Sequence, residues 1–173
     1  MLVVGEEPIS SPIEVDLEPN TEAGADRLVN SFAAWERYEQ ATIVVDFGTA
    51  TTFDVVSDAG AYIGGVIAPG VHLSLSALEE AAAKLPNVAI KAPSKVIGKN
   101  TVSAMQSGIY YGYASMIEGI ITRLKAEMSS DVKVLATGGL APLYAKEISL
   151  FDEVDQELTI QGLKAIYARQ TSK

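Results

Sequence analysis

The sequence predicts an α/β fold in which helices pack on a mixed sheet, and three observations support this. Runs rich in β-branched and aromatic residues predict neighbouring strands over 42–45, 51–56 and 61–68. A further run at 132–136 predicts a later strand. Apolar residues at helical spacing predict one long helix over 101–125. The 173 residues are 48% apolar and 20% charged, which suits one globular domain or one domain plus a fragment of another.

The first part of the chain differs in character from the rest. Residues 5–22 hold three prolines and six acidic residues around short apolar stretches. This pattern predicts an extended lead-in over 1–22 rather than a complete folded unit. Apolar residues at near-helical spacing then predict a helix over 23–39, which begins the domain that we expect over 23–173.

The remaining helices are predicted from the same spacing. Apolar positions outline a helix from Leu73 to Leu85 that ends before Pro86, another over 140–150 and a closing helix over 158–168. In the long helix, the main apolar stripe consists of Val102, Met105, Ile109, Gly112, Met116 and Ile120, and a wider face adds Tyr113, Ile117, Ile121 and Leu124.

The segment 46–54, Asp-Phe-Gly-Thr-Ala-Thr-Thr-Phe-Asp, directly follows a predicted buried strand. Gly48 lets the backbone approach a ligand, and Thr49, with the threonines at 51 and 52, can offer hydroxyl and N–H groups to phosphate oxygens. Asp46 and Asp54 can hold a cation. The segment therefore indicates a nucleotide-phosphate site, although an ordinary hairpin with a solvated Asp46 would also explain these residues.

Composition excludes several classes of function. The net charge of −9 argues against a nucleic-acid or anionic-membrane partner. There is no cysteine and His72 is the only histidine, which excludes a thiolate or histidine-rich metal site and leaves His72 as a structural or surface residue. The uncharged run 59–78 is broken by glycine and proline, so we reject a transmembrane segment. Residues 1–7 lack the basic and apolar regions of a signal peptide, so we expect a cytoplasmic protein.

Five motifs occur in order along residues 24–141. They are Gly24-Ala25-Asp26-Arg27, Asp46-Phe47-Gly48-Thr49-Ala50-Thr51, Gly64-Gly65-Val66-Ile67-Ala68-Pro69-Gly70, Thr101-Val102-Ser103-Ala104-Met105-Gln106-Ser107-Gly108 and Gly138-Gly139-Leu140-Ala141. This series resembles that of the type III pantothenate kinases. The family belongs to the actin-like ATPase superfamily, so the resemblance implies an actin-like, ribonuclease-H-like α/β fold. It also implies ATP-dependent phosphorylation of pantothenate to 4′-phosphopantothenate, the first step toward coenzyme A.

The resemblance implies roles for individual residues of the first motif and of the long helix. Asp26 matches the proton acceptor, and Gly24, Ala25 and Arg27 complete the pantothenate-binding segment around it. Thr101 matches a further substrate-binding residue. From the residues alone, Asp26 is equally a favourable charge near a helix N-terminus, and Thr101 is equally an N-cap.

The resemblance also implies the nucleotide, the ions and the oligomer. Thr49 and Gly48 match ATP contacts, Asp46 matches the ligand of a monovalent cation such as K⁺ or NH₄⁺, and Mg²⁺ accompanies ATP. The family is dimeric, and the long helix with Tyr110, Tyr111 and Tyr113 is the expected surface of a homodimer.

One departure from the family is large. Its chains begin with a strand and an Asp-Xaa-Gly-Asn-Thr phosphate-binding turn, which does not occur in this sequence. We therefore expect that 1–22 is a remnant of a first domain, and that the chain alone shows no measurable pantothenate phosphorylation and only weak ATP binding. Two alternatives are a non-catalytic regulatory or accessory member of the family and an actin-like phosphotransferase with another acceptor.

Overall fold

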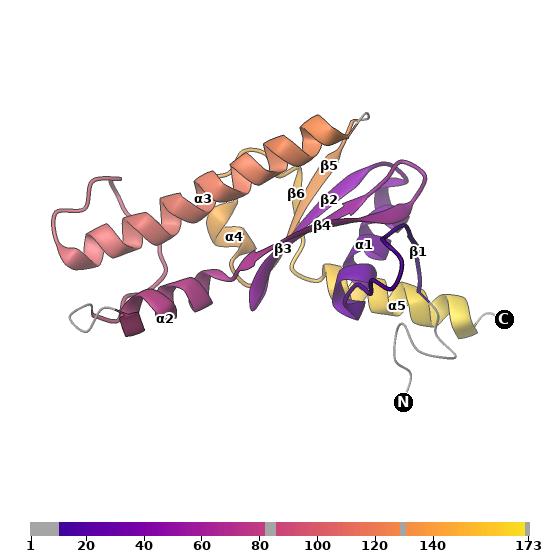
Figure 1. Ribbon diagram of the computed structural model, residues 1–173, viewed down its shortest axis with the longest axis horizontal. Helices are drawn as coiled ribbons and strands as arrows, with labels where there is room; N and C mark the ends of the chain where they lie inside the picture. Colours follow the sequence, from indigo (N-terminus) through magenta and orange to yellow (C-terminus); the bar gives the residue numbers. More distant parts are fainter. Residues whose placement is uncertain (1–10, 82–85, 129–130, 172–173) are drawn as a thin grey trace.

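The structure is a computed structural model that describes residues 11–81, 86–128 and 131–171 (Figure 1). The predicted lead-in contributes one short strand, and three consecutive strands follow the first helix. The elements are β1 (Glu14–Val15), α1 (Ala25–Tyr38), β2 (Thr42–Phe47), β3 (Ala50–Val56), β4 (Ala61–Pro69), α2 (Val71–Ala81), α3 (Thr101–Glu127), β5 (Lys133–Gly138), α4 (Ala141–Tyr144), β6 (Glu153–Val154) and α5 (Leu158–Thr171).

The strands form one mixed sheet in the order β1-β4-β3-β2-β5-β6. The chain runs antiparallel through β2, β3 and β4, whereas β5 lies parallel to β2. The predicted α/β class with a mixed sheet is therefore confirmed. Because β2 and β5 are parallel, their carboxyl ends meet at one edge of the sheet, with Asp46 opposite Thr137 and Phe47 opposite Gly138.

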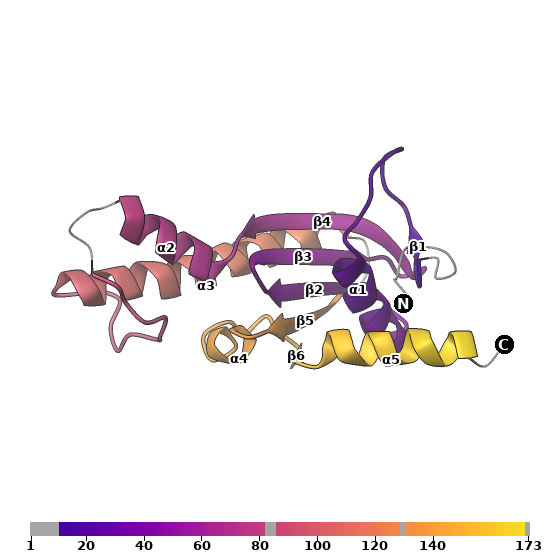
Figure 2. The ribbon, with the colours of Figure 1, turned by 90° about the horizontal axis from the view of Figure 1, so that it is seen from below.

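Helices cover both faces of the sheet. Ile43 and Val45 of β2 belong to the same buried cluster as Ile117 of α3, whereas Val44 packs with Ala34 of α1 on the other face. This alternation is expected for a strand buried on both sides. Figures 1 and 2 show α1 beside α5 on one face and α3 on the other.

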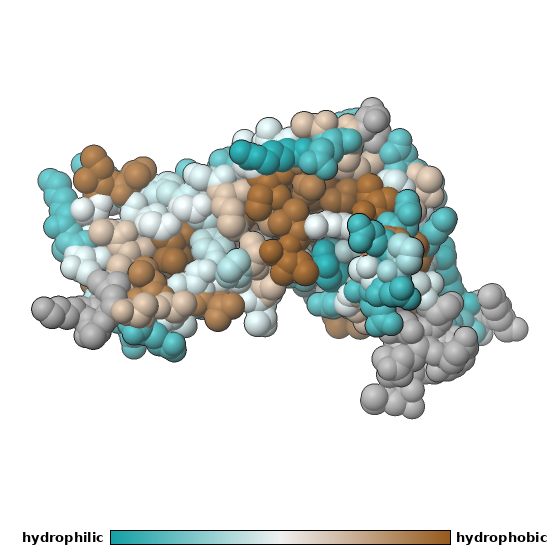
Figure 3. Space-filling model, in the orientation of Figure 1, coloured by the Kyte–Doolittle hydropathy of each residue, from teal (hydrophilic) through white to brown (hydrophobic). Residues whose placement is uncertain are grey.

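The molecule is elongated, because α3 is longer than the sheet is deep and runs past it together with α2 (Figures 1 and 2). Apolar surface lies over the middle of the face seen in Figure 3, where β4 runs. Two side chains of this strand, Ile63 and Ile67, are 41% and 65% exposed. Among the helices of the described ranges, none combines the length and apolarity needed to cross a bilayer.

Several predicted elements differ from the observed ones. The helix predicted over 140–150 is only the four-residue α4, and the chain then continues through turns in which Glu147 and Ile148 donate their N–H groups to the Tyr144 carbonyl. These turns still bury Ile148, so the apolar spacing was satisfied without a longer helix. The short strands β1 and β6 were not predicted, and Leu85, the expected end of α2, lies outside the described residues.

The face that α3 buries is mainly the wider apolar face named from the sequence, rather than the main stripe. Tyr113, Ile117 and Ile121 are buried, whereas Val102 is 42% exposed and Gly112 lies on the surface. Tyr110 is also buried, and its ring stacks at 5.4 Å on Tyr144. The tyrosine surface expected to form a dimer is therefore largely internal, because these rings fill the space between α3 and the sheet.

Candidate active site

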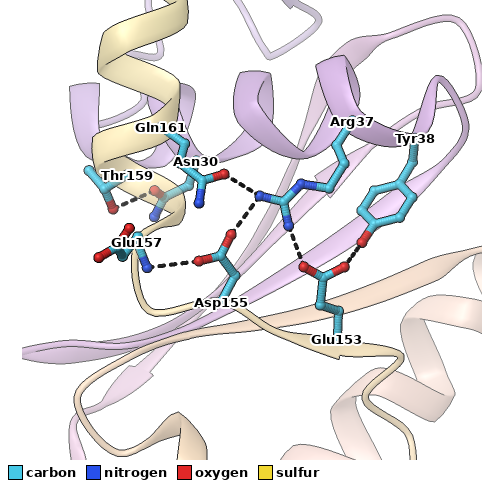
Figure 4. Close-up of polar contacts among 8 residues, drawn as sticks. All are labelled: Asn30, Arg37, Tyr38, Glu153, Asp155, Glu157, Thr159 and Gln161. Atoms are coloured by element: carbon cyan, nitrogen blue, oxygen red, sulfur yellow. Dashed lines mark hydrogen bonds and ion pairs between the residues drawn. The ribbon is translucent and has the colours of Figure 1, made fainter.

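Asp46 lies near the carboxyl end of β2, where the sheet meets α1. Its Oδ2 accepts a hydrogen bond of 3.1 Å from the Asn30 side chain of α1. Asn30 in turn accepts one of 2.7 Å from the hydroxyl of Thr159, which Figure 4 shows. Asn30 is 1% exposed, so its amide is held between the two partners. The first turn of α5 thus fixes the Asn30 side chain, which in turn fixes Asp46.

A second polar network joins the same elements farther along α1. Arg37 donates to Glu153 and Asp155 at 2.5 Å each, and Tyr38 donates to Glu153 (Figure 4). Burial works against ionisation of Asp155, but the bonds from Arg37 and the Glu157 N–H leave its pKa below the ordinary value. These contacts hold α1 against the β6–α5 connection.

The pKa of Asp46 is raised, first because the carboxyl group is buried. The hydrogen bond from Asn30 opposes this shift, whereas the carboxylates of Asp26 and Asp54 add to it. The structure therefore brings three carboxylates within electrostatic reach of one another, and two of them are the predicted catalytic and cation-binding residues. Asp26 itself is exposed in the first turn of α1, directly after Gly24 at the N-cap and Ala25.

The surroundings of Asp46 suit a monovalent cation. Gly138 adopts a φ of +89°, and a Cβ built on it would lie 2.7 Å from both Asp46 Oδ1 and the Phe47 carbonyl oxygen. Only glycine therefore lets the β5 backbone pass this close to the Asp46 carboxylate and the Phe47 carbonyl. One carboxylate with a backbone carbonyl is a donor set for a hard cation of low charge. The described residues hold no group of three acidic, histidine or cysteine side chains for a metal ion.

Asp54 does not share this role. Its carboxylate is fully buried and accepts a 2.6 Å ion-pair bond from Arg27 Nε, together with hydrogen bonds from the Tyr62 and Thr52 hydroxyls. The prediction that Asp54 can hold a cation was therefore wrong, because its oxygens already bind side chains. Burial raises the pKa of Asp54, and the contacts with Arg27, Thr52 and Tyr62 oppose that shift.

The glycine and threonine turn opens on a cavity of about 540 Å³. Of the three threonines expected to offer hydroxyls, only Thr49 does so. Thr51 is fully buried, and Thr52 donates to Asp54. The cavity is lined by Phe47, Gly48, Thr49, His72, Leu73, Ser76, Gly139 and Leu140. The two glycine turns predicted at separate strand ends thus face one cavity, and the exposed His72 lies at its wall.

Thr101 lies elsewhere in the molecule. It is the first residue of α3, and this end of α3 lies at the opposite end of the molecule from α1 (Figures 1 and 2). Nor is it the N-cap that its residue type suggested. Asn100 caps the helix and forms a capping box with Ser103, so the side chain of Thr101 is not needed there.

Sequence reasoning missed Asn30 and Thr159, which support the site, and assigned Asp54 a different role from the one it has. Asn30 and Thr159 lie 129 residues apart, and no local pattern relates them. Asp54 left a clearer signal, because an aspartate within an otherwise apolar strand needs a counter-charge. Arg27 supplies that charge from another element.

The profile of the type III pantothenate kinase family matches residues 1–123. A type III pantothenate kinase of Ruegeria sp. is 54% identical over 166 residues, which are 96% of this chain and 64% of that protein. One of Paramagnetospirillum magneticum is 53% identical over 171 residues, 99% of this chain and 66% of that protein. The chain thus spans about two thirds of the length of these curated relatives.

A solved structure from Campylobacter jejuni, described as a conserved Baf family transcriptional activator, has the same fold. Its TM-score is 0.63 at 22% identity, and the match covers 94% of this chain and 71% of that one. The family profile and the relatives at more than half identity agree: the chain belongs to the type III pantothenate kinase family.

Proposed function

We propose that the chain carries the acceptor site and part of the nucleotide site of an enzyme that transfers a phosphoryl group from ATP to pantothenate. The observation that carries this proposal is that Asp26 lies within electrostatic reach of Asp46, whose strand leads directly into the Gly48–Thr49 turn at the cavity. The mixed sheet and its two helical layers fit the actin-like ATPase fold of the family. The relatives' names supply the acceptor.

In this proposal, Asp26 accepts the proton of the primary hydroxyl of pantothenate as the oxygen attacks the γ-phosphorus of ATP. The hydroxyl oxygen then forms a bond to phosphorus, the bond to the ADP oxygen breaks, and no covalent enzyme intermediate is formed. Asp26 suits this role because it is exposed, so an incoming alcohol can reach it. Gly24, Ala25 and Arg27 bind the rest of the acceptor.

The nucleotide and ion sites lie at the ends of β2 and β5. We place ATP in the cavity beside Gly48 and Thr49, and a monovalent cation, K⁺ or NH₄⁺, next to Asp46 and the Phe47 carbonyl. Mg²⁺ arrives on the ATP phosphates. These ions supply positive charge to the phosphates, while Asn30 holds the Asp46 carboxylate in place. A cytoplasmic location provides both substrates.

A homodimer accounts for the position of Thr101. Asp26 lies at the start of α1 and Thr101 at the start of α3, and these helix starts are far apart in the molecule. If both residues bind the same pantothenate, a second copy must therefore supply one of them. The net charge of −9 argues against a nucleic-acid or anionic-membrane partner.

Phosphate transfer from ATP to pantothenate tests the proposal. It is measured with the chain itself and with a chimera in which the chain replaces the matched segment of the Ruegeria relative. Transfer by the chimera that depends on Asp26 supports the proposal. A folded chimera that binds ATP but does not phosphorylate pantothenate contradicts it.

A further inference from the structure

Asp54 is a fully buried carboxylate that contacts no part of the cation site, yet it holds a residue of the acceptor segment. It accepts a bond of 2.6 Å from Arg27 Nε, and the side chains of Arg27 and Asp54 are 16% and 0% exposed. Asp54 also accepts hydrogen bonds from the Tyr62 hydroxyl at 3.2 Å and from the Thr52 hydroxyl at 3.1 Å. Arg27 is thus bound by a carboxylate that two hydroxyls keep in place.

Asp54 and Tyr62 orient the Arg27 guanidinium, in addition to the ion pair that Asp54 forms with it. Arginine commonly binds a carboxylate through two parallel bonds, but Asp54 takes a single bond from Nε. The ring of Tyr62 lies with its centroid 5.7 Å from the guanidinium carbon. The carboxylate and the ring together restrict rotation of the guanidinium.

One terminal nitrogen of Arg27 has an unusual environment. Its Nη2 is buried and has no hydrogen-bond partner within the described part of the chain. Nη2 lies over Gly65 of β4, where an added Cβ would be 3.0 Å from it and 1.8 Å from the Phe53 carbonyl oxygen. Glycine is required at this point of the sheet first by the Phe53 backbone, and it also leaves the guanidinium uncrowded.

Stability alone does not account for this arrangement. A buried ion pair gains little over well-packed apolar residues, because removing two charges from water is costly. The pair holds Arg27 next to Asp26, and a need to orient the Arg27 guanidinium explains it better than a gain in folding stability. Arg27 follows Asp26 directly in the first turn of α1, so the contacts of Arg27 also anchor the turn that carries Asp26.

We propose that Asp54, assisted by Tyr62, is a positioning residue that orients Arg27 toward the carboxylate of the acceptor acid. This inference rests on the proposed function, because that function supplies an acceptor with both a hydroxyl and a carboxylate. Asp54 does not touch the acceptor and acts through Arg27.

The first test needs no ligand. In the 173-residue chain, the Nε–H signal of Arg27 is observed by ¹H–¹⁵N NMR and assigned by its loss in Arg27→Lys. We expect slow exchange with water in the wild type and at least about tenfold faster exchange in Asp54→Asn, because the charged acceptor is lost. Tyr62→Phe, which removes one hydroxyl, gives a smaller increase and serves if Asp54→Asn fails to fold. Unchanged exchange in folded Asp54→Asn or, failing that, in Tyr62→Phe would overturn the inference.

The second test compares two ligands by calorimetry: pantothenate, and its alcohol analogue in which a hydroxymethyl group replaces the carboxylate. We expect the wild type to prefer pantothenate, and Asp54→Asn to lose about tenfold of this preference. Asp155→Asn is the matched control, since it removes one of the two acidic partners of Arg37, which lies on the same helix as Arg27, and leaves the preference unchanged. A folded Asp54→Asn that keeps the full preference contradicts the inference. A wild type that does not bind pantothenate contradicts the proposed function instead. The exchange of the Arg27 Nε–H in Asp54→Asn then shows whether Asp54 holds Arg27.

Discussion

Asp26 is exposed at the start of α1, so its carboxylate can be changed without disturbing the core. We predict that Asp26→Asn lowers kcat of the chimera by about two to four powers of ten, because the substitution removes the proton acceptor. Initial rates at saturating ATP and pantothenate measure this, and circular dichroism confirms the fold. A rate near that of the wild type would exclude Asp26 as the base.

Asp46 affects the pH dependence of stability. Burial and neighbouring carboxylates raise its pKa above 3.8. The folded state then binds this proton more tightly than the unfolded state does. The contribution of Asp46 to stability is full below pH 3.8 and is lost as the pH rises through the raised pKa. At pH 7, the ionised group therefore makes the fold less stable.

We predict that Asp46→Asn raises the melting temperature at pH 7, because the neutral amide avoids the cost of a buried charge and still accepts from the Asn30 side chain. The gain should shrink as the pH falls toward 3.8. Scanning calorimetry in buffers free of potassium and ammonium measures it. Asp155→Asn is the control with the opposite sign, because the lowered pKa of Asp155 stabilises the fold at pH 7. A lower melting temperature for Asp46→Asn at pH 7 would contradict the conclusion that the ionised Asp46 makes the fold less stable.

At the start of α3, two adjacent residues have different expected roles: Asn100 caps the helix, and Thr101 binds the acceptor. Asn100→Ala removes the cap and its reciprocal bond with Ser103, so we predict a loss of about 1 kcal/mol. Thr101→Ala should change stability by less than about 0.5 kcal/mol but raise the pantothenate KM of the chimera. Thermal melts and initial-rate kinetics of both variants provide the measurement. An unchanged KM in Thr101→Ala would remove Thr101 from the acceptor site.

The strands β2, β3 and β4 and the helix α3 were predictable because their patterns are long and repeat. The turn after β2 was also predictable, since glycine and threonine next to Asp46 restrict both its shape and its chemistry. The cap of α3 was assigned one residue too late, because Asn100 and Thr101 are both good caps and sequence does not decide between them.

The Arg27–Asp54 pair could not be predicted in detail. The two residues are 27 positions apart, and they meet only because α1 packs across the sheet on which Asp54 lies. The side of α3 that is buried could not be predicted for a similar reason. Its sequence is apolar on more than one side, and the sheet and α4 decide which side is buried.

The exposed side of α3 is the surface that we expect to pair with a second copy. It presents small residues, and an added Cβ at Gly108 or Gly112 would meet nothing within 4 Å, so a partner helix can approach closely. The exposed small residues are Ala104, Gly108, Gly112 and Ser115.

We predict that the chain is dimeric at micromolar concentrations and that Gly112→Glu makes it monomeric, because a long charged side chain keeps two helices apart. The substitution also improves helix propensity, so the fold is retained. Light scattering measures the mass, and Ile160→Glu on the exposed side of α5 is the matched control. A wild type that stays monomeric, or a Gly112→Glu variant that stays dimeric, would show that α3 does not form the interface through this side.

The separation of Asp26 and Thr101 leads to a stricter prediction about the whole assembly. If each acceptor site combines Asp26 of one copy with Thr101 of the other, a dimer of one Asp26→Asn chain and one Thr101→Ala chain has one intact site and one site with both changes. We therefore predict that an equal mixture of the two variants, dissociated and reassembled in the chimera, recovers about a quarter of wild-type activity at low pantothenate, since half of the dimers are mixed. Each variant alone should remain far below this level. If mixing gives no more activity than the average of the two variants, both residues act within one chain or Thr101 does not bind the acceptor.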